Sequence, residues 1–165
     1  EDQIVKGIDS LIVCGTTGEG STLSHEEHIK VLATAAQVAN KRVPIIAGTG
    51  SNDTVYSVEL CDDAEKAGAD ALLVVTPYYN KATQKGLIES FKAIADASTK
   101  PCILYNVPSR TGCNIKPETL LKLAEVDNIV AVKEGNEEAA KMFKGTDCGL
   151  AMREGWTVEK NNLME

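Results

Sequence analysis

A lysine ends one of the most apolar stretches of this sequence. Lys133 follows residues 129–132, a short aliphatic run that reads as a buried strand. Removing an ammonium group from water lowers its pKa, and the neutral amine that results is a nucleophile toward carbonyl carbon. Residue type and position therefore predict Schiff-base chemistry at Lys133. Taken alone, the residue has a second interpretation, because strand-end lysines often extend their stems to reach water.

The second chemical signal is a set of hydroxyl side chains. They lie at the end of three other apolar runs or just after them. They belong to Thr16, Thr17, Tyr78, Tyr79 and Tyr105. An imine-forming site needs a proton shuttle for carbinolamine formation and dehydration, and it needs donors that hold the carboxylate of a keto acid. Each residue alone has a plainer interpretation, as part of a turn, a rim contact or a core tyrosine. Together they predict a catalytic site, provided that their strands are neighbours.

Short apolar runs alternate with helical patterns, and these elements would position the reactive groups. The runs cover residues 11–14, 44–47, 71–75, 102–105 and 129–132. The helical patterns cover residues 24–38, 52–66, 84–97 and 117–124, the first with a capping box at its start. The runs are apolar throughout, which indicates strands covered on both faces. The sequence thus predicts an α/β protein with a parallel sheet.

Two architectures are built from such units, an eight-fold barrel and a doubly wound sheet. A dinucleotide-binding sheet would carry Gly-x-Gly-x-x-Gly, but residues 48–53 lack the third glycine. The loop at residues 15–20 lacks the lysine of a phosphate-binding loop. Polar groups instead follow several strands, where barrel enzymes keep their sites, so the barrel is favoured.

Composition restricts the class of protein. The 165 residues are 43% hydrophobic and 25% charged, with a net charge of -7. This acidic balance and the lack of a Lys/Arg cluster argue against a nucleic-acid partner. No apolar stretch reaches the length of a membrane-spanning helix, and the N-terminus lacks the order of a signal peptide. We therefore expect a cytoplasmic protein without membrane or nucleic-acid partners.

Histidine and cysteine usage argues against metal and disulfide chemistry. The two histidines, His25 and His28, supply few ligands, and the sequence predicts neither a metal nor a cofactor. The cysteines show no Cys-x-x-Cys spacing and are predicted to be reduced thiols in or near the core. They are Cys14, Cys61, Cys102, Cys113 and Cys148.

Four segments together resemble the dihydrodipicolinate synthase family in order and spacing. They are GTTGE at 15–19, TPYYN at 76–80, LYNVPSRTG at 104–112 and VKE at 132–134. The similarity runs from Lys6 to Glu134. It implies a TIM (β/α)8 barrel, usually a homotetramer, that condenses pyruvate with L-aspartate 4-semialdehyde to 4-hydroxy-tetrahydrodipicolinate. This lyase reaction belongs to the diaminopimelate route of lysine biosynthesis.

The resemblance implies roles for the matching residues. Lys133 would form the imine with pyruvate, and Thr16 and Thr17 would hold the pyruvate carboxylate. Tyr105, Thr17 and Tyr79 would form a proton relay, in which Tyr79 reaches into the neighbouring subunit's site.

Arg110 bears on the choice between members of the superfamily. By the resemblance, its guanidinium offers a bidentate fork to the carboxylate of the second substrate. Without the resemblance, Arg110 reads as a solvated loop residue. Two alternatives remain beside the synthase: another keto-acid or sugar-acid aldolase, similar to N-acetylneuraminate lyase, and an inactive barrel fragment that acts as an interaction module.

A lysine effector site is implied by a further set of matching positions. In lysine-inhibited members of the family the effector binds at a dimer interface, and the matching residues here are His25, His28, Asn52 and Tyr78. Tyr56 stands where the family commonly has a glutamate, so weak inhibition by lysine is expected. Without the resemblance, both histidines read as first-turn residues of an exposed helix.

The resemblance also predicts an incomplete barrel. We count five strands where the family has eight, with a start inside what would be the first helix. Residues 1–134 would form a partial barrel of about five βα units, and residues 135–165 a divergent C-terminal tail without a further strand. Because such a barrel cannot close, poor turnover is expected although the reactive residues are present.

Overall fold

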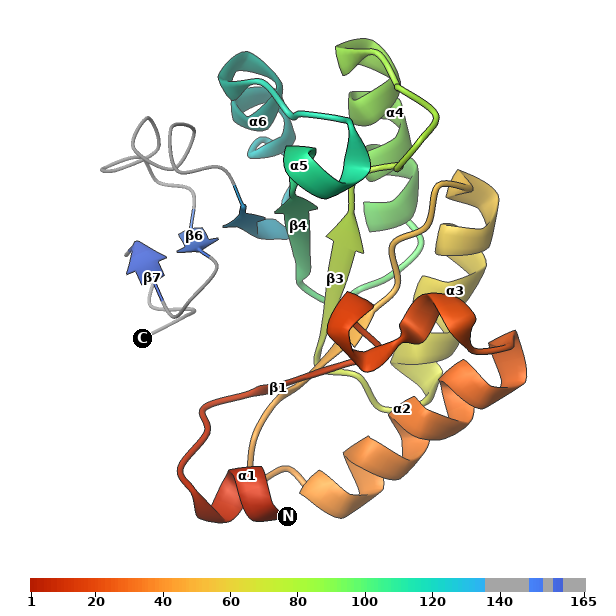
Figure 1. Cartoon of the computed structure of the whole chain (residues 1–165), viewed down its shortest axis with the longest axis vertical. Helices are drawn as coiled ribbons and strands as arrows, with labels where there is room; N and C mark the ends of the chain where they lie inside the picture. Colours follow the sequence, from red (N-terminus) through yellow and green to blue (C-terminus); the bar gives the residue numbers. More distant parts are fainter. Residues whose placement is uncertain (136–148, 153–155, 159–165) are drawn as a thin grey trace.

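The strands of this protein follow one another in a single sheet in the order of the sequence. A computed structural model describes residues 1–135, 149–152 and 156–158. Its seven strands lie in the order β1 to β7, as Figure 1 shows for most of them. Strands β1 to β6 pair in parallel, and β7 pairs antiparallel with β6. A doubly wound sheet would reverse its strand order at a switch point, so this order supports the predicted barrel.

The described elements agree closely with the predicted ones. The strands are β1 (Leu11–Val13), β2 (Ile45–Gly48), β3 (Ala71–Val75), β4 (Cys102–Asn106), β5 (Ile129–Glu134), β6 (Gly149–Met152) and β7 (Trp156–Val158). The α-helices are α1 (Asp2–Val5), α2 (His25–Ala39), α3 (Thr54–Lys66), α4 (Gln84–Ala95), α5 (Pro108–Thr111) and α6 (Pro117–Leu123). Two 3-10 turns, η1 (Thr16–Gly18) and η2 (Gly20–Thr22), follow β1. None of the described helices combines the length and apolar character needed to cross a membrane.

The prediction of no strand after Glu134 is wrong. Strand β6 adds to β5 in parallel, with Ala151 opposite Lys133, and β7 then runs back along β6. The sequence of β6, Gly-Leu-Ala-Met, contains no β-branched residue, so strand propensity gave no signal there. The rest of the predicted tail, residues 136–148, 153–155 and 159–165, lies outside the described residues.

Side-chain caps fix where the main helices begin. At α2 the Ser24 hydroxyl accepts from the backbone N–H of Glu27, whose carboxylate accepts from the Ser24 N–H, so the predicted capping box is present. Asp53 accepts two backbone N–H groups at the start of α3, and Thr83 accepts one at the start of α4. These caps set the loop lengths between the strands' carboxyl ends and the helices.

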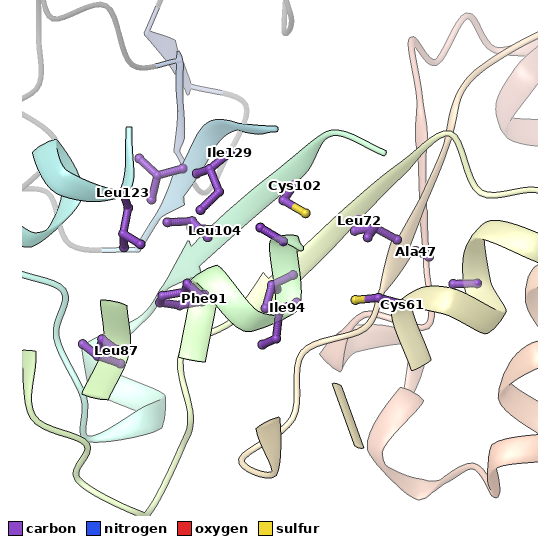
Figure 2. Close-up of a cluster of buried hydrophobic side chains, with 14 of the residues drawn as sticks. Ala47, Cys61, Leu72, Leu87, Phe91, Ile94, Cys102, Leu104, Leu123 and Ile129 are labelled. Carbon is purple, nitrogen blue, oxygen red and sulfur yellow. The ribbon is translucent and has the colours of Figure 1, made fainter. Parts of the chain in front are cut away.

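The main core lies on the helix-facing side of the sheet (Figure 2). Leu72 on β3 and Leu104 on β4 are buried there together with Phe91 of α4 and Leu123 of α6. Cys14, Cys61, Cys102 and Cys113 are free and buried, as predicted, while Cys148 lies outside the described residues. Burial raises the pKa of Cys61 to about 11 and that of Cys102 to about 12, so these thiols stay protonated at neutral pH.

The other face of the sheet carries the reactive pair. Strand side chains alternate between faces, and Ile46, Leu73, Ile103 and Ala131 form a smaller cluster opposite the helices. Tyr105 packs against this cluster. Lys133 follows Ala131 by two residues and therefore points to the same side.

Close backbone approach at Gly50 leads to a stability prediction. A Cβ at Gly50 would overlap the backbone nitrogen of Val75, whereas a Cβ at Gly18 would meet nothing within 4 Å. We expect Gly50→Ala to lower the free energy of unfolding by about 1–3 kcal/mol, because the backbone must shift. Urea denaturation with Gly18→Ala as the control measures this, and equal stability of the two variants would contradict the packing described.

Candidate active site

A cleft at the carboxyl ends of the first strands gathers most of the predicted site residues. Its volume is about 490 Å³. Its lining includes Lys133, Tyr105, Thr16, Thr17, Tyr78 and His28. Because the carboxyl ends of parallel strands meet at one edge of the sheet, groups from β1, β3, β4 and β5 share this space.

Lys133 and Tyr105 lie side by side in the wall of the cleft. They are opposite each other in the β4–β5 ladder, and the Lys133 Nζ lies 4.1 Å from the centroid of the Tyr105 ring. Both residues are half-buried. A cation over the face of a tyrosine ring is attracted by the ring quadrupole, which holds the lysine head group in one place. The arrangement presents an amine and a phenol to the same small ligand.

Thr16 and Thr17 come to the cleft through a sharp turn after β1. Cys14 has a φ of 57°, a left-handed conformation that redirects the chain, and the turn η1 starts two residues later. The Glu19 N–H donates to the Thr16 carbonyl at 3.1 Å and closes this turn. Both threonines are exposed and line the cleft, so their hydroxyls can donate to a bound carboxylate.

Two of the predicted catalytic and substrate-binding residues lie outside the cleft. Tyr79 is 88% exposed and has a φ of 70°, whereas its neighbour Tyr78 lines the cleft. The Tyr79 N–H donates to the Thr111 carbonyl at 3.1 Å, which ties this loop to α5. Arg110, in the last turn of α5, is also exposed and does not line the cleft.

The four predicted effector residues divide into two pairs. His28 and Tyr78 line the cleft, but His25 and Asn52 do not. The His25 Nε2 lies 3.1 Å from the Asp63 Oδ2, and the His25 ring meets the Tyr56 ring edge-on at 5.9 Å. The structure therefore does not gather all four in this cleft.

One group of side chains in the described part of the chain has metal-ligand spacing, although the sequence predicts no metal. The ligand atoms of His25, Glu59 and Asp63 lie within 4.8 Å of one another. Asp63 also pairs with Lys66 at 3.4 Å, so a positive charge already lies beside this carboxylate. His25 lies on α2 and Asp63 on α3, so their hydrogen bond explains the cluster as a contact between two packed helices.

His28 corrects the expectation of an exposed first-turn histidine. It is only 4% exposed, and its Nε2 is buried without a hydrogen-bond partner among the described residues. Burial in this setting lowers the pKa of His28 below its usual value of 6.5. Exposure could not be judged from the helical position, because the backbone at Gly20 and Gly48 lies against this side chain.

The lowered pKa of His28 predicts acid sensitivity. Below about pH 6.5 the unfolded chain binds a proton at this position that the folded chain does not, so stability falls as the pH falls. We expect a smaller free energy of unfolding at about pH 5.5 than at about pH 7.5 in urea denaturation. His28→Asn should reduce the difference between the two values. An unchanged difference in this variant would contradict the assignment.

Sequence reasoning missed two groups of residues near the reactive pair. Ser21 and Ser51 line the cleft, and the rule that barrel sites lie after the strands could have found them. Asn106 and Glu134, at the ends of β4 and β5, are fully buried and hydrogen-bonded to each other. The available signal in the sequence was Glu134, a charged residue at the end of an otherwise apolar strand.

Comparisons with known proteins agree with this architecture. The model of the dihydrodipicolinate synthetase family matches residues 1–150. The 4-hydroxy-tetrahydrodipicolinate synthase of Acetivibrio thermocellus is 62% identical over 136 residues, which cover 82% of this chain and 47% of that protein. The pyruvate complex of Acinetobacter baumannii dihydrodipicolinate synthase superposes with a TM-score of 0.86 at 46% identity, covering 92% of this chain and 54% of that one. A structure described as the first monomeric dihydrodipicolinate synthase variant gives a TM-score of 0.86 at 36% identity, covering 93% and 54%.

The fold and the cleft define a barrel-type α/β protein with its site at the carboxyl ends of the strands. This confirms the predicted fold class, since the structural neighbours are TIM barrels. The chain belongs to the dihydrodipicolinate synthetase family. It spans about half the length of the curated relatives it matches. The family match extends to residue 150, beyond the predicted limit at Glu134.

Proposed function

We propose that this chain carries the imine-forming site of a 4-hydroxy-tetrahydrodipicolinate synthase. The observation that carries the proposal is the Lys133 amine held 4.1 Å from the centre of the Tyr105 ring, in a cleft that Thr16 and Thr17 also line. The names of the relatives reported above favour this function over the sugar-acid alternative. The substrates are then pyruvate and L-aspartate 4-semialdehyde.

The proposed chemistry begins with attack of the Lys133 amine on the keto carbon of pyruvate. The resulting carbinolamine loses its hydroxyl as water, which requires a proton donor beside the amine. We assign this role to Tyr105, because its ring lies against the lysine head group. The hydroxyls of Thr16 and Thr17 hold the pyruvate carboxylate. Loss of a methyl proton from the imine gives the enamine that adds to the aldehyde carbon of the semialdehyde.

The proposal gives roles to two residues outside the cleft, Tyr79 through an assembly of chains and Arg110 at the mouth of the cleft. The exposed Tyr79 ring is free to reach a neighbouring subunit's cleft, where it would extend the relay of Thr17 and Tyr105. Arg110 would hold the carboxylate of the semialdehyde at the mouth of the cleft, as a bidentate partner. The role of Tyr79 requires a homo-oligomer, for which the family resemblance suggests a tetramer.

Hydrogen exchange at pyruvate tests the function directly. If Lys133 forms an imine and an enamine, the chain in D₂O should replace the methyl protons of pyruvate with deuterium, and proton NMR follows this exchange. Adding L-aspartate 4-semialdehyde should then consume pyruvate, slowly because the chain spans about half of its relatives. Adding N-acetylmannosamine, the acceptor of a sugar-acid enzyme, should not consume pyruvate. Methyl exchange at the buffer rate would refute the proposal.

Lysine binding is a separate expectation. Tyr56 lines the cleft beside His28, and it offers no carboxylate to the amino group of a lysine effector. We therefore expect lysine at millimolar concentration to leave pyruvate exchange nearly unchanged. Titration with lysine measures this, and a low-millimolar inhibition constant would show that Tyr56 does not remove the effector site. In Tyr56→Glu we expect inhibition to appear.

A further inference from the structure

A polar pair is buried directly beyond the reactive pair. Asn106 and Glu134 end β4 and β5, and both are 0% exposed. The Asn106 Nδ2 donates to both carboxylate oxygens of Glu134, at 3.1 Å and 2.8 Å. Burying an amide and a carboxyl group is unfavourable unless hydrogen bonds compensate, and a well-packed apolar pair would fill the same space without that cost. The polar pair therefore calls for a reason other than stability.

The asparagine amide is fixed from both of its ends. Its Nδ2 also donates to the Asn114 Oδ1 at 2.9 Å, and its Oδ1 accepts from the Ile115 N–H at 3.1 Å. The Gly135 N–H donates to the Asn106 carbonyl at 2.7 Å, immediately after Glu134. Because a backbone N–H faces the oxygen of the side chain, the amide has one orientation. The carboxylate of Glu134 is thus held at a defined position along β4.

The same ladder sets the position of the catalytic lysine. Asn106 is opposite Glu134, one step beyond Tyr105 opposite Lys133. A slip of β5 by one residue would turn Lys133 from the cleft to the helix side. The ladder is irregular where it begins, with a register shift between Cys102 and Ile103. Its register at the reactive end therefore needs a contact that only one alignment can make.

We propose that Asn106 and Glu134 are positioning residues that lock the β4–β5 register and so hold the Tyr105 ring against the Lys133 amine, ready for a 2-keto acid. Neither residue needs to touch the substrate. The keto-acid part of this inference rests on the proposed function, but the contact between ring and amine does not.

The experiment follows that contact without any substrate. Reductive methylation of the 165-residue chain with ¹³C-formaldehyde places ¹³C-methyl groups on its lysines, and the signal missing from Lys133→Arg identifies Lys133. In the parent chain the ring current of Tyr105 should shift this signal upfield of the exposed lysines. The rate of pyruvate labelling with borohydride is measured on the same proteins without methylation.

Three variants separate positioning from stability. Asn106→Leu/Glu134→Leu removes both polar partners together, which keeps the burial and avoids an unpaired charge. Glu134→Gln is the conservative variant, since its amide oxygen can still accept from Asn106. Asn128→Ala is the matched control, because Asn128 donates to the carbonyls of Ala95 and Ser98 at the amino end of β5.

The double variant should lose the upfield shift and label with pyruvate about 10- to 100-fold more slowly. Its urea midpoint should fall as well, because the buried Ile115 N–H loses its acceptor, but the chain should stay folded in the absence of urea. Glu134→Gln and Asn128→Ala should keep the shift. The inference would be overturned if the folded double variant kept the upfield shift, or if Asn128→Ala lost it as well. It would also be overturned if the Lys133 signal of the parent were not shifted. An upfield signal in a parent that never labels with pyruvate would refute the proposed function and leave the positioning role standing.

Discussion

We expect Lys133→Arg to abolish pyruvate-dependent labelling by borohydride, down to the level measured without pyruvate. Arginine keeps a positive charge over the Tyr105 ring, so the contact that orders this side chain is preserved. Its guanidinium stays protonated and cannot condense with a ketone as a neutral amine does. The variant therefore removes the nucleophilic amine and keeps the positive charge. Intact-mass analysis after reduction measures the labelled fraction.

The control for this variant is Lys122→Arg, an exposed lysine in the last turn of α6, away from the cleft. It should label like the parent chain. Persistent labelling of Lys133→Arg would mean that another lysine captures pyruvate, and the role of the strand-end amine would be lost.

Tyr105→Phe should slow the formation of the imine by about 10²- to 10⁴-fold, the usual contribution of general acid–base catalysis. Phenylalanine keeps the ring beside the amine and removes only the hydroxyl, so the position of Lys133 changes little. The final extent of labelling at long times should match the parent, because a catalyst does not move an equilibrium. Rapid-quench reduction with borohydride at a series of times gives both quantities.

An unchanged rate in Tyr105→Phe would assign the proton transfers to water or to another group. A lowered final extent with an unchanged rate would instead give the tyrosine a role in binding. Neither result is expected from the geometry of the cleft.

The sequence predicted the five parallel strands and the four main helices because local signals and burial agreed there. The aliphatic run of β3 and the capping box at Ser24 each act within a few residues. Strand β6 was missed because Gly-Leu-Ala-Met has little intrinsic strand preference, and it forms beside the open edge of β5. Its existence depends on a partner that a local pattern does not contain.

The site shows the same division between local and long-range causes. Lys133, Tyr105 and the two threonines could be predicted, since each lies at the carboxyl end of a strand or just after it and all such ends meet at one edge of the sheet. The burial of His28 could not be predicted, because it depends on the backbone at Gly20 and Gly48, which other segments of the fold bring to its ring.

The most direct measurement is the mapping of the pyruvate adduct on the unchanged chain. The 165-residue chain is incubated with pyruvate, reduced with borohydride, digested and analysed by tandem mass spectrometry. The account predicts one reduced adduct per chain, on Lys133, with the other lysines unmodified at the same pyruvate concentration. An adduct on a different lysine, or no adduct on a folded chain, would contradict it.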